Sequence, residues 1–202
     1  MTLHRRRFLI AACTLPLCTI APAAPEPPLV FEGFRFERRV QVAGVPLQLN
    51  GTGLRAVAWF KGFAAALYLT NRASAAQQAV AMGGPKRLQL RLFHDVPAGE
   101  FAKAFRKGME RNSEPDDRAR LAERIARFEA QINALGTVRK DDTDDTVDLD
   151  LDPGRGTLFG VNGTLRGDAV PGDDFYAALL RSFVGDKPYD NRLKAGLLGR
   201  PA

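Results

Sequence analysis

Few residues of this 202-residue chain have the type and spacing that metal chemistry requires. Asp148, Asp150 and Asp152 have the opening spacing of a calcium-binding loop. However, Pro153 stands where such a loop needs glycine, and Phe159 stands where its chelating glutamate belongs. The apolar residues that alternate with these aspartates favour instead an edge strand with its charged side in water. We therefore expect no metal site here.

Cysteine and histidine chemistry is equally poorly represented. Both cysteines, Cys13 and Cys18, lie within residues 1–23, and His94 is the only histidine after that segment. A multi-histidine metal site is thus excluded, and nothing singles out a nucleophile for a histidine-based triad. The segment 51–56 matches a dinucleotide-binding fingerprint in form, but it precedes a strand pattern and no βαβ unit surrounds it. We expect no cofactor.

The first 23 residues have the pattern of an export signal. Arg5, Arg6 and Arg7 precede an apolar run, and Ala21-Pro22-Ala23 offers small residues for cleavage. The Arg-Arg-x-Phe-Leu pattern favours the twin-arginine route over an ordinary secretory signal. The apolar run contains Pro16 and is too short for a stable membrane anchor. We expect a cleaved segment 1–23, a single domain over 24–202, and a periplasmic or secreted protein.

The charge pattern argues against a nucleic-acid partner. The net charge is +6, and loss of the three signal arginines would lower it to +3. Seven basic residues between Arg106 and Arg127 resemble a nucleic-acid patch, but acidic residues are interleaved at helix-pair distances, as in Asp116 with Arg120 and Glu123 with Arg127. This interleaving is typical of a solvated helix face.

Hydrophobic periodicity and turn residues place strands and helices along one chain. Apolar stripes at helical spacing predict helices over 97–111, from Ser113 to Leu135, and from Asp173 to Val184. The predicted helix caps are Ser74, Ser113 and Asp173. Asn162-Gly163 predicts a two-residue hairpin turn, and Asn50 to Gly53 also predicts a turn. The remaining expected elements are a short helix over 74–82, strands in 34–49 around Ala43-Gly44, strands over 54–60 and 63–69, and a half-exposed strand over 86–93.

Three segments, read in this order, resemble the chalcone isomerase-like family over about residues 35–199. They are a glycine-rich turn with an arginine-bearing strand from Gly51 to Arg55, followed by 61–69; a helix over 97–112; and a carboxyl segment with hairpin, buried helix, Gly185 to Pro188, and Leu193 to Gly199. The resemblance implies an α+β open-faced sandwich, in which a layer of helices covers one side of a curved antiparallel sheet. A ligand cleft would lie between the two layers.

The resemblance also implies which residues line the cleft. Arg55 matches the family's cleft arginine, and Ser182 falls where plant enzymes of the family carry a hydroxyl. Those enzymes cyclise a chalcone to a flavanone, and their reaction needs donors that hold an enolate. Here Phe63 replaces the strand threonine, Phe101 the helix tyrosine and Gly108 the helix asparagine. Phenylalanine cannot donate a hydrogen bond, so the cleft would stay apolar but lose its donors.

Three functions follow from this pattern. The first is the binding of a small apolar or amphipathic molecule, such as a fatty acid, with its anionic or carbonyl end near Arg55. The second is an intramolecular lyase or isomerase that acts through Arg55 and Ser182. The third is a structural or interaction module, in which Arg55 is merely ion-paired and Ser182 fills a small packing space.

Overall fold

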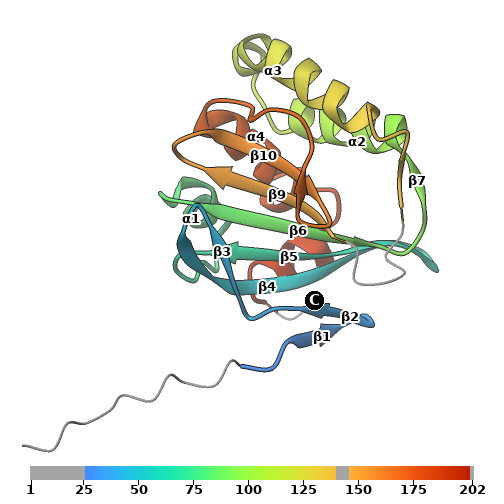
Figure 1. Ribbon diagram of the computed structural model, residues 1–202, viewed down its shortest axis with the longest axis vertical. Helices are drawn as coiled ribbons and strands as arrows, with labels where there is room; N and C mark the ends of the chain where they lie inside the picture. Colours follow the sequence, from blue (N-terminus) through green and yellow to red (C-terminus); the bar gives the residue numbers. More distant parts are fainter. Residues whose placement is uncertain (1–25, 140–145, 201–202) are drawn as a thin grey trace, which may run out of the picture.

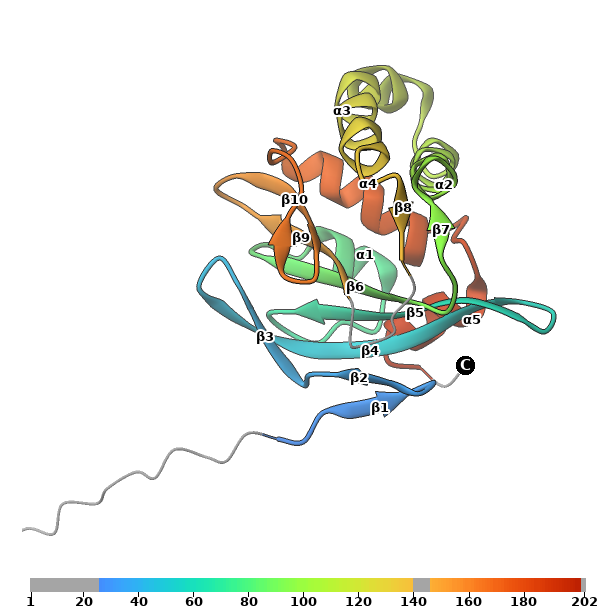
Figure 2. The same cartoon turned by 45° about the vertical axis from the view of Figure 1, so that its right-hand side comes forward.

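The computed structural model of the chain describes residues 26–139 and 146–200 (Figure 1). The predicted signal, residues 1–23, and the aspartates between 141 and 145 lie outside these ranges. Figures 1 and 2 show a curved sheet with the helices gathered on one side of it and a small hairpin, β1–β2, on the other. This is the predicted α+β open-faced sandwich.

The main sheet of the described residues has seven strands in the order β11-β10-β9-β6-β5-β4-β3. Every neighbouring pair in it is antiparallel. Its strands are β3 (Arg39–Val42), β4 (Val45–Val57), β5 (Phe60–Leu69), β6 (Lys86–Leu92), β9 (Val147–Asp152), β10 (Gly156–Val161) and β11 (Thr164–Leu165). Two smaller pairs join β1 (Leu29–Phe31) to β2 (Phe34–Phe36) and β7 (Val96–Pro97) to β8 (Thr137–Val138).

The helices form because their apolar residues recur on one face that the sheet can bury. They are α1 (Ala76–Ala81), α2 (Ala98–Arg111), α3 (Pro115–Asn133), α4 (Asp173–Val184) and α5 (Asn191–Leu197). In α2 the predicted stripe of Phe101, Phe105 and Met109 is buried. In α4 apolar residues surround most of the helix, and the helix is correspondingly buried between the sheet and α2.

Both faces of the central strands are buried, but by different partners. Leu67 and Leu88 point into the large core under the helices, whereas Tyr68 points into a smaller core that includes Phe36. The amino-terminal strands cover this second core. The prediction of a half-exposed strand over 86–93 is therefore wrong, because the polar face of β6 is also covered, and its Arg91 donates to the Arg35 carbonyl.

The predicted turn at Asn50 to Gly53 is also wrong, since β4 runs through it with an irregularity between Leu49 and Gly51. The glycines serve a close approach of α5 instead. A Cβ at Gly51 would lie 2.9 Å from the Leu197 carbonyl oxygen, and a Cβ at Gly53 would lie 3.0 Å from Leu193 Cα. Glycine thus lets this helix pack directly on the strand backbone.

The aspartate strand β9 lies inside the sheet, between β6 and β10, rather than at an edge in water. Asp148 and Asp150 are buried. Asp150 accepts two hydrogen bonds from Arg87, at 2.7 and 2.6 Å, and Asp148 accepts one from Gln89 at 2.8 Å. Their role is therefore cross-strand pairing, which satisfies buried charge within the sheet.

The turn and cap predictions had mixed outcomes. Asn162 and Gly163 both have positive φ angles, 53° and 71°, as the predicted hairpin turn requires. The turn between β4 and β5 lies at Ala58, with φ of 51°, and not at Lys61-Gly62. The predicted helix caps at Ser74, Ser113 and Asp173 do not form; the residues before α1, α3 and α4 make no side-chain cap bond.

Candidate functional site

A cavity of about 230 Å³ lies between the sheet and α2. Its floor comes from β4, β5 and β6, and its roof from α2 and the end of α4. We call it the apolar cavity. Its lining residues are Arg55, Phe60, Gly62, Phe63, Leu90, Leu92, His94, Asp95, Val96, Glu100, Phe101, Ala104, Phe105, Phe183 and Tyr189. Three of the predicted site residues, Arg55, Phe63 and Phe101, are thus brought together.

Arg55 is placed by the pairing of β4 with β5. It lies directly opposite Phe63 in the register, and Phe63 in turn lies opposite Leu92 on β6, so all three side chains share the helix-facing side. The Arg55 guanidinium carbon is 6.0 Å from the Phe63 ring centre and 5.9 Å from that of Tyr189. Two aromatic faces therefore hold the cation at the cavity.

Arg55 has no acidic partner among the residues that the structure describes. Within the described residues it forms no ion pair, and its buried Nε has no hydrogen-bond partner. A half-buried guanidinium normally finds a carboxylate or carbonyl acceptor, because leaving a buried donor unsatisfied is costly. The alternative in which Arg55 merely completes an ion pair of the fold is thus not what the structure shows.

The wall of the apolar cavity is made of packed phenylalanines. Phe101 and Phe105 are in edge contact with ring centres 4.9 Å apart, and Phe183 lies 6.0 Å from Phe105 and 6.2 Å from Phe63. None of these rings carries a hydrogen-bonding group. The wall can bury an alkyl chain or an aromatic ring, but it cannot orient a carbonyl.

Ser182 does not line the apolar cavity. It is fully buried in α4, where its hydroxyl makes a long bond, 3.5 Å, to the Ala178 carbonyl and also interacts with the Tyr189 side chain. Such a bond back to the preceding helical turn is common for a serine that fills a packing space. The structure therefore places Ser182 behind the wall that Tyr189 and Phe183 form.

Tyr189 is the site residue that sequence reasoning missed. Its hydroxyl donates to the Ala104 carbonyl at 2.9 Å, and its ring packs against Phe183 with centres 5.0 Å apart. Burial raises its pKa, although a contact with Ser182 and the charge of Arg55 oppose the shift, so the phenol stays protonated at neutral pH.

Gly108 makes room for this tyrosine. A Cβ at position 108 would lie 2.6 Å from the Tyr189 ring carbon that carries the hydroxyl, and 2.9 Å from Ser182 Cβ. Real Cβ atoms do not approach that closely, so α2 needs glycine here. A glycine in the middle of an otherwise well-formed helix was the available signal for a close neighbour.

The mouth of the apolar cavity lies beside the β4–β5 hairpin. Phe60 lines the mouth and stacks on His94 with ring centres 4.7 Å apart. At the hairpin tip Val57, Trp59 and Phe60 are all exposed, Trp59 by 94%. Apolar side chains therefore continue from the cavity to the surface.

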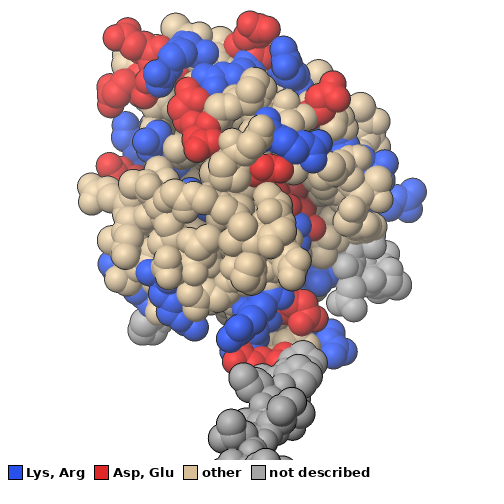
Figure 3. All heavy atoms as spheres, turned by 60° about the vertical axis from the view of Figure 1, so that its left-hand side comes forward, with Lys and Arg blue, Asp and Glu red and all other residues tan. Residues whose placement is uncertain are grey.

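Charges are mixed over the helical layer, as Figure 3 shows at the top of the molecule. Arg124 forms two hydrogen bonds with Asp174, at 2.7 and 2.8 Å, and Arg127 pairs with Glu123 as the sequence predicted. Arg120 pairs with Asp117, one residue from the predicted partner. Interleaved pairs of this kind leave little uncompensated positive charge on the helices.

The described residues contain neither a metal-binding cluster nor a membrane-spanning helix. In that part of the chain no cluster of three or more histidine, cysteine, aspartate or glutamate side chains is arranged to hold a metal ion. No helix among the described residues is long and apolar enough to cross a membrane.

Comparisons with known proteins agree with the architecture. A family model described as chalcone isomerase-like matches residues 29–199. Among solved structures, a fatty-acid binding protein of Arabidopsis thaliana superposes with a TM-score of 0.61 at 14% identity, over 85% of this chain and 95% of that one. A search of the curated proteins gave no match. At such low identity the structural likeness shows the fold alone.

Proposed function

The chain belongs to the chalcone isomerase-like family, and we propose that it binds one elongated apolar or fatty-acid-like molecule in the apolar cavity. The anionic or carbonyl end of that molecule pairs with Arg55. The observation that carries this proposal is the Arg55 guanidinium, which has no acidic partner in the described ranges 26–139 and 146–200 and lies at a phenylalanine-lined cavity.

Arg55 and the phenylalanines would recognise the two ends of such a ligand. A carboxylate would give the unsatisfied Arg55 donors an acceptor, and a hydrogen bond to a charged group contributes about 1.5–3 kcal/mol. The tail would replace water against Phe63, Phe101 and Phe105, which contributes about 25 cal/mol for each Å² of apolar surface removed from water. Both contributions require a molecule that is polar at one end only.

The same residues favour binding over catalysis. Closing a flavanone ring needs donors at the substrate ketone as charge develops. Phe63 and Phe101 have no donor, and the Tyr189 hydroxyl is already bonded to the Ala104 carbonyl. Arg55 remains the cation that a ligand carboxylate would meet. The fold it shares with a fatty-acid binding protein is consistent with such a ligand.

Arg55→Met tests this proposal. Native mass spectrometry of the purified chain should show a co-purifying lipid, and dodecanoate should raise the melting temperature of the delipidated chain. Arg55→Met keeps the length of the side chain and removes its charge, so dodecanoate binding should weaken about tenfold or more. The ligand-free variant should melt near the wild-type temperature, because removing an unpaired, half-buried cation offsets the loss of its contacts with Phe63 and Tyr189.

Arg155→Met is the matched control. Arg155 is exposed in the β9–β10 turn, far from the apolar cavity. Its replacement by methionine should therefore leave dodecanoate binding unchanged. Repeated absence of any lipid together with no dodecanoate effect on melting would refute the binding function and favour an interaction module. A large loss of stability in ligand-free Arg55→Met would instead assign Arg55 to the fold.

A second candidate function is an intramolecular lyase or isomerase. Tyr189 favours it, because it is the one hydroxyl-bearing residue among those that line the apolar cavity and its ring lies beside Arg55; the hydroxyl would have to leave the Ala104 carbonyl to act on a substrate. If the chain is such an enzyme, a 2′-hydroxychalcone should lose its visible absorbance faster with wild type than with Arg55→Met or Tyr189→Phe. Equal rates for all three proteins would eliminate this candidate.

We also propose that the chain acts outside the cytoplasm, on the strength of the arginine pair and apolar run in residues 1–23. Cell fractionation combined with intact mass should find a chain that begins at Ala24 in the exported fraction. Replacement of Arg5 and Arg6 by lysine should retain the precursor inside if the twin-arginine route is used. A full-length cytoplasmic chain in the unaltered protein would contradict the proposal.

A further inference from the structure

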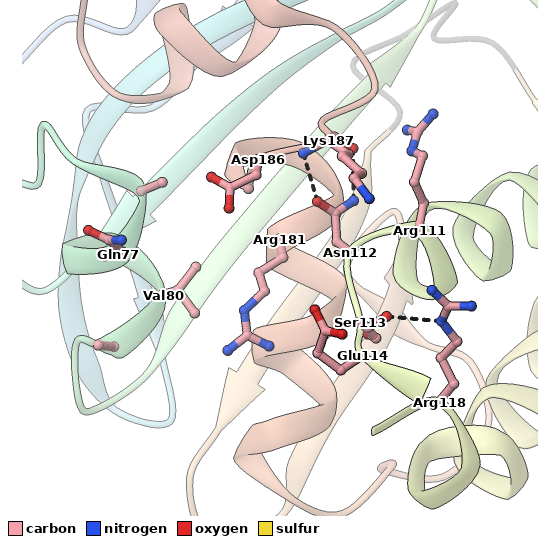
Figure 4. A pocket seen from close by; sticks show the side chains of 13 residues that line it. Gln77, Val80, Arg111, Asn112, Ser113, Glu114, Arg118, Arg181, Asp186 and Lys187 are labelled. Atoms are coloured by element: carbon pink, nitrogen blue, oxygen red, sulfur yellow. Dashed lines mark hydrogen bonds between the residues drawn. The ribbon is translucent and has the colours of Figure 1, made fainter. Parts of the chain in front are cut away.

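A second cavity of about 390 Å³ lies between α1, the α2–α3 connection and the carboxyl end of α4 (Figure 4). We call it the polar cavity. It shares no lining residue with the apolar cavity. On the α1 side its wall is Ala76, Gln77, Val80 and Ala81, and the other sides carry most of its polar groups.

The polar cavity has an excess of positive charge. Four basic and two acidic residues line it, and within the described part of the chain none of the six forms an ion pair with another residue. Arg118 donates to the Ser113 carbonyl at 2.9 Å and Arg111 to the Pro188 carbonyl at 3.2 Å, so both keep their full charge. The six residues are Arg111, Arg118, Arg181, Lys187, Glu114 and Asp186.

Arg181 is the central cation. It is half-buried, and Figure 4 shows its side chain reaching from α4 toward Val80 and Gln77 of α1, with Glu114 to one side. Among the described residues its guanidinium makes no hydrogen bond. The other five charged residues of the cavity are all exposed, so water and salt screen their effect on an anion more than they screen Arg181.

Ser113 gives an independent sign of a missing partner. Ser113 lines the polar cavity, only 8% of the residue is exposed, and its hydroxyl oxygen, which is shielded from solvent, has no hydrogen-bond partner. Buried hydroxyls in folded proteins nearly always have one. A ligand in the cavity would supply an acceptor once the side chain rotates its hydroxyl toward it.

The cavity is held in shape by bonds between the α2–α3 connection and the turn after α4. The Asn112 amide donates to the Lys187 carbonyl at 2.8 Å and accepts from the Lys187 N–H at 3.0 Å. Gly185 permits this contact, since a Cβ there would lie 2.9 Å from Asn112 Oδ1. Lys194 donates to the Gly185 carbonyl at 2.8 Å, which offsets the negative end of α4.

We propose that the polar cavity binds a small organic anion, a carboxylate or a phosphate ester. Its oxyanion pairs with Arg181, an oxygen accepts from the Ser113 hydroxyl, and a short carbon skeleton lies against Ala76 and Val80. Guanidinium groups suit both carboxylate and phosphate oxygens. This site is separate from the one that Arg55 serves, so it stands or falls independently of the proposed lipid function.

Amide chemical shifts of the ¹⁵N-labelled full chain test the site. Succinate, glycerol 3-phosphate and inorganic phosphate are titrated separately at constant ionic strength, so that the carboxylate and phosphate sources are distinguished. At least one should give saturable shifts confined to residues 112–114, 181 and 185–187. Absence of any saturable shift up to about 10 mM, or shifts scattered over the surface, overturns the proposal.

Arg181→Gln should weaken the best of these probes about tenfold or more, because it removes a charged hydrogen-bonding pair. Ser113→Ala, which is easily accommodated, should weaken it about threefold. Arg155→Gln, which removes the same charge from a distant turn, should change nothing. If Arg155→Gln weakens anion binding as much as Arg181→Gln does, the effect of charge is non-specific and the site is refuted. Wild-type affinity in both Arg181→Gln and Ser113→Ala would also refute it. Dodecanoate binding should survive in Arg181→Gln.

Discussion

Replacement of Gly108 by alanine sets two known effects against each other in one helix. In an open position, alanine stabilises a helix interior by about 1 kcal/mol relative to glycine. At position 108, however, the new Cβ would lie 2.6 Å from a Tyr189 ring carbon and 2.9 Å from Ser182 Cβ. Ser182 is fixed inside α4, so Tyr189 must move.

The cost follows from what Tyr189 contacts. Displacement breaks its bond to the Ala104 carbonyl, a contribution of about 1 kcal/mol. Its edge packing on Phe183 contributes about 0.5–1.5 kcal/mol, and its contact with the Arg55 cation about 0.5–1 kcal/mol. The loss of about 2–3 kcal/mol exceeds the helix gain, so Gly108→Ala should destabilise the chain by about 1–2 kcal/mol. Its melting temperature should fall by about 3–6 °C.

Gly99→Ala is the matched control in the same helix. Its new Cβ would meet only Asn133 Oδ1, at 3.7 Å, an ordinary contact, so this variant should be more stable than wild type by up to about 1 kcal/mol. Thermal and urea unfolding measure both variants. In a Tyr189→Ala background, Gly108→Ala should cost less than in the wild-type chain, because only the close approach to Ser182 Cβ remains. If Gly108→Ala matches Gly99→Ala in the wild-type chain, Tyr189 does not occupy the space above Gly108 and the site description is wrong.

Two further predictions concern ligand length and pH. The apolar cavity has room for about eight water-sized units at roughly 30 Å³ each. Fatty-acid affinity should therefore rise by about 0.8 kcal/mol per methylene and level off near eight to ten carbons. Calorimetry that shows the same steep rise up to about sixteen carbons would contradict this cavity size. Arg124 lowers the pKa of Asp174 by hydrogen bonding. The stability this pair contributes should therefore be complete above the ordinary aspartate pKa of about 3.9 and lost as pH falls through the lower folded value. The melting difference between wild type and Asp174→Asn should vanish in strong acid, and a constant difference would refute the assignment.

Periodicity predicted the elements whose burial is one-sided, and it failed where burial came from distant segments. The stripe Phe101, Phe105 and Met109 and the hairpin turn at Asn162 are local signals, and both were correct. The sequence predicted that Asp150 is exposed to solvent, because every second residue of its strand is an aspartate. In the structure Arg87 of β6 neutralises it within the sheet, and no pattern local to β9 contains that partner.

Glycine was misread for the same reason. Gly51 and Gly53 have the local appearance of a turn, but the contact that requires them comes from α5, more than a hundred residues later. Sequence reasoning can detect that a glycine is unexpected in a helix or strand, and it cannot say which backbone approaches. The resemblance to a family supplied Arg55 and Phe101 as expected cleft residues, and both line the apolar cavity.

Tyr189 shows why site residues cannot be predicted fully by matching single positions of this chain to a family pattern. Relative to the plant pattern, the helix asparagine is absent at Gly108, and a position-by-position reading counts this only as a lost donor. In three dimensions the same glycine creates the space that the Tyr189 hydroxyl fills, from a turn far along the chain. The change at 108 and the tyrosine at 189 are therefore one structural feature, and restoring a polar side chain at 108 would displace the phenol rather than add a second donor. Changes at 108 and 189 should therefore not have independent effects, because Tyr189 lines the cavity beside Arg55 and Gly108 gives it room.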